Sequence, residues 1–98
     1  MWTGTLACDL LLGDCRSRKQ KRAVVRPLLA ELRRRYDVCA AETGHLELLR
    51  RAEVGVAVVS GDAAHCVEVL DAVERFVAGR PETDLLATRR RLHGPDDD

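Results

Sequence analysis

Aromatic side chains are scarce in this 98-residue chain, which has only Trp2, Tyr36 and Phe76. Sheets that recognise RNA stack bases on pairs of exposed aromatic rings, so this scarcity argues against that class of protein. The sequence also contains no asparagine, a residue that commonly reads adenine edges or stabilises an oxyanion. A nucleic-acid partner would therefore be recognised through its backbone and shape.

Long apolar runs are missing as well. The run at 56–59 is far shorter than the ~20 residues that a membrane-spanning helix needs, and no export signal opens the chain. We therefore expect a cytoplasmic protein that does not associate with membranes. The four cysteines form no CxxC pair, and no glycine-rich phosphate loop is present. The sequence thus predicts free thiols, no metal site and no cofactor.

The residues that are present suit one small folded domain. Apolar residues make up 46% of the chain and charged residues 33%, a composition typical of globular proteins. With so few aromatic rings, the core must consist of Val, Leu and Ala. We expect a single domain over 1–92, followed by a disordered acidic tail over 93–98.

Charge is distributed unevenly, although the net charge is zero. Residues 16–35 contain nine basic side chains and one acidic one, so this segment carries +8 and the rest of the chain −8. Such a division matters for the choice of partner more than the total charge does.

Periodicity and turn residues divide the chain into six elements. Ser17, with Gln20 three residues later, has the pattern of a capping box at a helix start, and Asp62 is a second candidate N-cap. Pro27 lies inside the first helix and predicts a kink there. Strands are expected over 2–12, 37–42, 52–61 and 83–92, and helices over 18–36 and from Asp62 to Gly79.

This β-α-β-β-α-β order is the ferredoxin-like pattern, an α+β fold with both helices on one face of a four-stranded antiparallel sheet. Residues 54–59 are apolar or small on both faces of their strand, and Leu6, Leu10 and Leu11 add to the apolar surface. A large apolar face is seldom left in water. We therefore expect a homodimer through the open sheet face, with a monomer as the alternative.

The basic first helix is the main candidate binding site. Lys19, Arg22, Arg26 and Arg33 fall on one stripe at helical spacing, and guanidinium groups bind phosphates bidentately. Cations at a helix start oppose the helix dipole, so another reason for them is required. The alternative is pairing with acids of the second helix. The hypothetical phosphate contacts are Arg16, Lys19, Lys21, Arg22, Arg26 and Arg33.

A second candidate is the loop after the second strand, where Glu42, His45 and Arg51 lie close in sequence. Histidine beside carboxylates can perform acid–base chemistry. No nucleophile or metal ligand set completes this loop site, so we expect a protein that is not an enzyme. A small-molecule enzyme centred on His45 is the weaker alternative, and the sequence indicates no small-molecule ligand.

Three segments resemble the YlxP-like family of small bacterial proteins: "SRKQKR" at 17–22, "AETGHLELLRRAEVGVAVVS" at 41–60 and "HCVEVLDAVERFV" at 65–77. The resemblance covers about 2–92, although Gly44 and Leu49 stand where the family commonly has Asp and Trp. It implies a ferredoxin-like fold that is often dimeric and has no established enzymatic activity. The residues that match the family pattern are Ser17, Lys19, Lys21, Arg22, Glu42, His45 and Arg51.

The resemblance also implies a role near RNA or the ribosome, because genes of the family commonly lie beside those for translation initiation and ribosome maturation factors. Together with the basic helix, this favours a non-enzymatic module associated with RNA or the ribosome. A homodimeric protein-interaction or scaffold module without nucleic acid is the alternative function.

Overall fold

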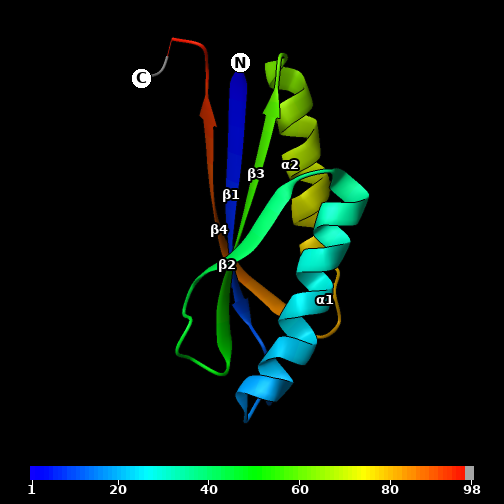
Figure 1. Ribbon diagram of the computed structural model, residues 1–98, viewed down its shortest axis with the longest axis vertical. Coiled ribbons are helices and arrows are strands. Elements are labelled where there is room, and N and C mark those ends of the chain that lie inside the picture. The colour runs from blue at the N-terminus through cyan, green and yellow to red at the C-terminus, as the bar shows by residue number, and fades with distance from the viewer. Residues whose placement is uncertain (97–98) are drawn as a thin grey trace.

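A computed structural model describes residues 1–96 and confirms the predicted order of elements (Figure 1). The first helix has the predicted bounds, and the other elements begin and end within one or two residues of prediction. The elements are β1 (Trp2–Leu11), α1 (Arg18–Tyr36), β2 (Cys39–Gly44), β3 (Arg51–Ser60), α2 (Ala63–Ala78) and β4 (Asp84–His93).

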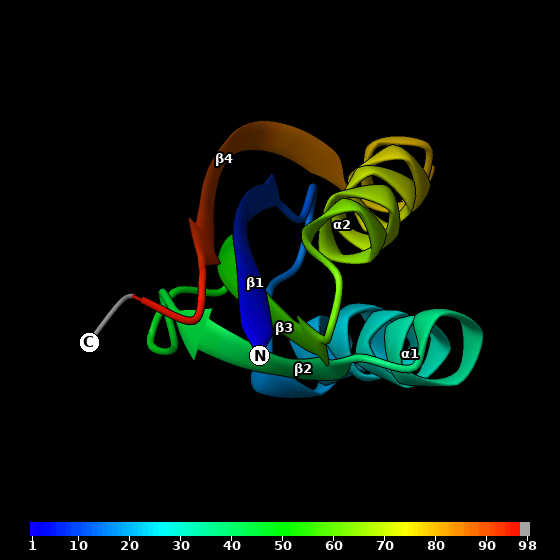
Figure 2. The same cartoon turned by 90° about the horizontal axis from the view of Figure 1, so that it is seen from above.

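The strands form one antiparallel sheet in the order β2-β3-β1-β4, and both helices cover the same face (Figure 2). Helix α1 lies over β2, whereas α2 lies over β1, β3 and β4. This is the ferredoxin-like α+β fold that the sequence predicts. Within residues 1–96, no helix lies over the opposite face of the sheet.

Strand alternation places the core between the sheet and the helices. The even-numbered residues Leu6, Cys8 and Leu10 of β1 and the valines 54, 56 and 58 of β3 are buried there. They pack with the apolar stripes of the helices, including Leu28 and Leu70. Because Leu6 and Leu10 face the helices, the open face is less apolar than the sequence suggests, and the homodimer remains a prediction.

Both predicted helix starts are confirmed by their caps. The Ser17 hydroxyl accepts a hydrogen bond from the Gln20 amide at 3.1 Å, and the Gln20 side chain accepts one from the Arg16 amide at 2.6 Å. The Asp62 carboxylate accepts from the Ala64 amide at 3.0 Å. The bonds accepted by Ser17 and Asp62 satisfy donors that the first helical turns would leave unpaired. Helix α1 runs without interruption through Pro27.

The chain between β2 and β3 forms turns without a helix, and Lys21 reaches it from α1. At the other end, β4 includes His93, one residue beyond the predicted domain boundary. The acids 97 and 98 of the predicted tail lie outside the described residues. Neither helix within residues 1–96 is long and apolar enough to cross a membrane.

Candidate functional site

The basic residues of α1 separate into internal and available groups, and Lys21 belongs to the interior. Only 5% of its surface is exposed, and its ammonium group lies 2.8 Å from a Glu42 carboxylate oxygen. The same group donates to the carbonyl oxygens of His45 at 2.9 Å and Leu48 at 2.6 Å. The buried ammonium group therefore has one ion pair and two hydrogen bonds, all to β2 or to the β2–β3 connection. Lys21 therefore fastens the β2–β3 connection to α1, and the prediction that it contacts phosphate is corrected.

Two other predicted contacts, Arg33 and Arg16, also have partners within the chain. The Arg33 guanidinium donates twice to the Ala40 carbonyl oxygen, at 2.6 and 3.1 Å, which ties the end of α1 to β2. Arg16 lies 3.2 Å from Asp14, and both side chains are exposed. An ion pair in water contributes only about 0–1 kcal/mol, so Arg16 can exchange its partner for an external anion at little cost.

Lys19, Arg22 and Arg26 form the available group. They are exposed, and within the described residues none of them makes an ion pair. Arg22 and Arg26 line a groove of about 300 Å³ between α1 and the β2–β3 connection. Arg18, which pairs with the exposed Glu47 at 2.8 Å, lines the same groove. We call this the α1 groove; its other lining residues are Lys21, Val25, Leu29, Glu42 and Leu46.

The acids of α2 do not neutralise the α1 groove. In residues 1–96, no ion pair joins the two helices, and the acids Asp71 and Glu74 bind Arg90 of β4 instead, at 2.7 and 3.3 Å. This arrangement removes the helix–helix pairing that the sequence left open as an alternative. The helices meet at their ends through Tyr36 and Phe76, whose rings lie edge to face 5.8 Å apart.

The predicted loop site divides between the two faces of the sheet. Glu42 points toward the helices and pairs with Lys21, whereas His45 and Arg51 converge on Asp9 on the open face. The Asp9 Oδ2 atom lies 2.5 Å from an Arg51 guanidinium nitrogen. The other carboxylate oxygen, Oδ1, lies 3.3 Å from the His45 ring nitrogen Nε2. His45 has a positive φ of 55°, which turns the chain at the end of β2.

A neighbouring carboxylate, Glu53, completes the polar end of the open face. It accepts a hydrogen bond from the Thr43 hydroxyl at 2.8 Å and another from the Arg89 guanidinium at 2.6 Å. Thr43 and then Arg89 lower the pKa of Glu53, and the hydrogen bond from Arg51 is the main cause of the lowered pKa of Asp9. Both groups are therefore ionised at neutral pH, which suits ion pairing better than general acid catalysis.

Sequence reasoning missed Asp9, which is the centre of this cluster. Its signal is present in "LACDLLL", where a single acid interrupts an apolar strand. Strand pairing then brings Asp9 opposite Glu53 and near Arg51, although more than forty residues separate it from them.

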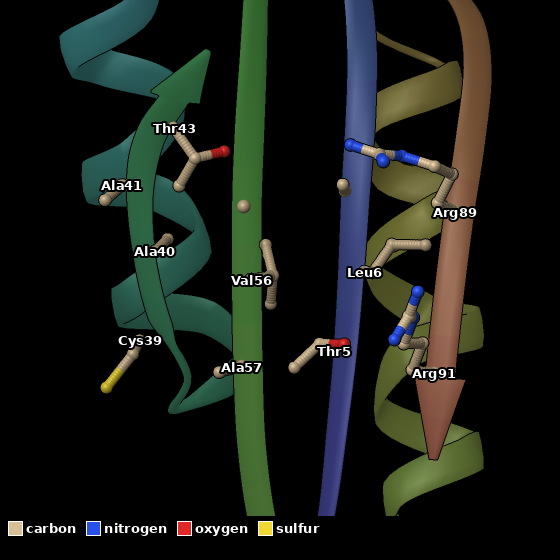
Figure 3. Close-up of a pocket in the computed structure, with 12 residues that line it drawn as sticks. Thr5, Leu6, Cys39, Ala40, Ala41, Thr43, Val56, Ala57, Arg89 and Arg91 are labelled. Atoms are coloured by element: carbon tan, nitrogen blue, oxygen red, sulfur yellow. The ribbon is translucent and has the colours of Figure 1, made fainter.

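The open face next to this cluster contains a second hollow, of about 540 Å³ (Figure 3). Its floor consists mainly of small residues of β1, β2 and β3, and its β4 side is formed by Arg89 and Arg91. Cys39 also lines it and is the exposed member of four free cysteines.

Burial is the main cause that raises the pKa of Cys8 to about 11, so that buried thiol stays protonated.

The family described as "Protein of unknown function (DUF503)" matches residues 3–90, which include the α1 groove and every lining residue of the second hollow except Arg91. The chain belongs to this family. It is also similar to "Uncharacterized protein YlxP" of Bacillus subtilis (strain 168), with 29% identity over 86 residues that cover 88% of this chain and 94% of the relative. The family resemblance carried by the three sequence segments is thus confirmed.

Proposed function

We propose that this member of the family is a non-enzymatic module that binds structured RNA, such as RNA at the ribosome surface. In this proposal Arg22 and Arg26 contact phosphates from the α1 groove, and Lys19 contacts them from the exposed surface of the same helix. Arg16 and Arg18 join them by exchanging their exposed carboxylate partners. Lys21 and Arg33 act indirectly, because they hold the walls of the groove in place.

The observation that carries this proposal is the set of exposed cations on one side of α1, of which Lys19, Arg22 and Arg26 make no ion pair within residues 1–96. Arg18, Arg22 and Arg26 are spaced four residues apart, and like charges at this spacing destabilise a helix by about 0.2–0.5 kcal/mol per pair. Arg18 and Lys19 lie in the first turn of α1, where a positive charge also interacts unfavourably with the helix dipole. A bound polyanion would reverse both effects, because its phosphates would screen the repulsion and pair with the guanidinium groups.

The type of polyanion is inferred from two further arguments. RNA is favoured by the gene neighbourhood that the family resemblance implies. Recognition of backbone rather than bases is favoured because the open sheet lacks aromatic rings and the chain lacks asparagine. The module would therefore bind many structured RNA sequences with similar affinity and discriminate by shape.

The test is fluorescence anisotropy with a ribosomal RNA hairpin over a series of salt concentrations. The logarithm of the binding constant should fall linearly with the logarithm of the salt concentration, because counterions are released on binding. Each neutralised phosphate makes this slope steeper by about 0.9. Arg22→Gln and Arg26→Gln are each expected to weaken binding and to reduce that slope by about one.

Arg75→Gln is the matched control, because Arg75 is an exposed arginine on the other helix without an ion pair among residues 1–96. It should leave both affinity and slope unchanged. Equal losses for Arg75→Gln and Arg22→Gln would show that only total charge matters and would contradict the placement on α1. Absence of binding at low salt would favour the protein-interaction module, whose partners should survive nuclease treatment in a pulldown.

A further inference from the structure

The hollow on the open face lies on the side of the sheet opposite α1 and takes no part in the RNA binding proposed above. Its volume of about 540 Å³ is within the range of roughly 300–1,000 Å³ typical of small-molecule sites. We refer to it as the open-face hollow.

Strand register explains both the shape and the charge of this hollow. One row across the sheet runs from Ala41 through Gly55 and Ala7 to Arg89. The next row runs from Cys39 through Ala57 and Thr5 to Arg91. Each row therefore has small side chains on the inner strands and ends in an arginine on β4, so a low floor is bordered by guanidinium groups (Figure 3).

The floor at Gly55 has no room for a larger residue. A Cβ atom added there would come within 2.7 Å of the Thr43 methyl carbon, because that side chain leans over the glycine. Thr43 is itself held by its hydrogen bond to Glu53. The hollow is thus a defined depression with a fixed threonine wall on the β2 side.

The two arginines differ in their charge balance. Arg89 pairs with Glu53 at 2.6 Å, whereas Arg91 is exposed and makes no ion pair within residues 1–96. The hollow therefore has one uncompensated positive charge beside an apolar floor. Ionised Glu53 and Asp9 at its polar end would repel a group with two negative charges more strongly than a group with one.

We propose that the open-face hollow binds a small amphiphilic monoanion, namely a carboxylate with a compact apolar body. The apolar body would lie on Ala7 and Ala57 beside the Thr43 side chain that covers Gly55, and the carboxylate would bind the fork of Arg91, whose two parallel donors match its two oxygens. This site is independent of the proposed RNA contacts, because α1 lies on the other face of the sheet (Figure 2).

The test compares two fluorescent probes that differ in charge: anilinonaphthalene sulfonate, a monoanion, and phenylnaphthylamine, its neutral analogue. Wild type should bind one sulfonate probe per chain. Arg91→Gln should weaken the sulfonate about tenfold, the usual effect of losing one charge-assisted hydrogen bond, and leave the neutral probe unchanged. Ala57→Leu should weaken both probes, because it raises the floor.

Arg22→Gln serves as the control for binding of the probe in the α1 groove, and it should not change either titration. Competition with naphthoate and naphthyl phosphate separates the anion classes, and naphthoate should displace the sulfonate probe more effectively. Arg91→Gln should in turn leave RNA binding unchanged, so the two proposals fail separately.

Two results would overturn the proposal. One is sulfonate binding that Arg91→Gln leaves intact. The other is the combination of no binding of either probe with sedimentation as a dimer that Ala57→Leu dissociates. That combination would show that a second copy of the chain occupies the open face. Circular dichroism of each variant distinguishes loss of binding from loss of fold, and Arg91→Gln keeps the test decisive if Ala57→Leu fails to fold.

Discussion

Replacing Lys21 with methionine tests whether the buried cation of α1 is structural. The substitution keeps most of the side-chain volume but removes the charge from a residue that is 5% exposed. It leaves a Glu42 carboxylate oxygen without its ammonium partner and the carbonyl groups of His45 and Leu48 without their donor. The damage therefore comes from unpaired polar groups rather than from a cavity.

The expected loss of unfolding free energy follows from these contacts. Removing one partner of a buried ion pair costs about 3–5 kcal/mol, because the remaining charge is left without compensation. The Glu42 side chain retains 23% of its exposure, so water reaches it and the lower end of the range applies. A loss of about 3 kcal/mol corresponds to a decrease in Tm of roughly 12–24 °C for a domain of this size.

Urea unfolding followed by circular dichroism measures this loss, and hydrogen exchange locates it. The Leu48 amide, which donates to the His45 carbonyl at 3.0 Å, should lose protection first because the β2–β3 connection is released. Lys19→Met is the matched control, since Lys19 is an exposed lysine two residues earlier on the same helix. Its effect should stay within about 0.5 kcal/mol.

A double-mutant cycle with Glu42→Gln completes the experiment. If the ion pair is responsible, the double variant should be clearly more stable than the sum of the two single losses implies. A Lys21→Met protein with wild-type stability would refute the reasoning, and it would return Lys21 to the group of available phosphate contacts.

The remaining predictions concern the open face and the thiols. Asp9 has a lowered pKa in the folded state, so its stabilising contribution is present above its ordinary pKa near 3.8 and is lost as pH falls through the folded value. Asp9→Asn should therefore flatten the acid limb of a plot of Tm against pH, and an unchanged limb would contradict this. Iodoacetamide should modify only Cys39 in the native protein, and mass spectrometry should detect the other three thiols only after unfolding.

Much of the fold follows from local features of the sequence. Ser17, Gln20 and Asp62 mark the helix starts because capping bonds join residues only two to four positions apart. Alternation in β4 correctly separates Arg90, which faces α2, from Arg89 and Arg91 on the open face. Periodicity and caps are read within one element, so they need no knowledge of its neighbours.

The roles of individual charges depended on the tertiary structure. The nine cations of residues 16–35 cannot be told apart by composition. Lys21 is nevertheless buried against a connection 24 to 27 residues away, while Arg22 next to it remains exposed. Asp9 meets Arg51 across 42 residues through the pairing of β1 with β3. The sequence by itself determined which elements form and which faces they bury, because those choices are local. Which charges are satisfied was decided only when strand register and helix packing brought distant side chains together.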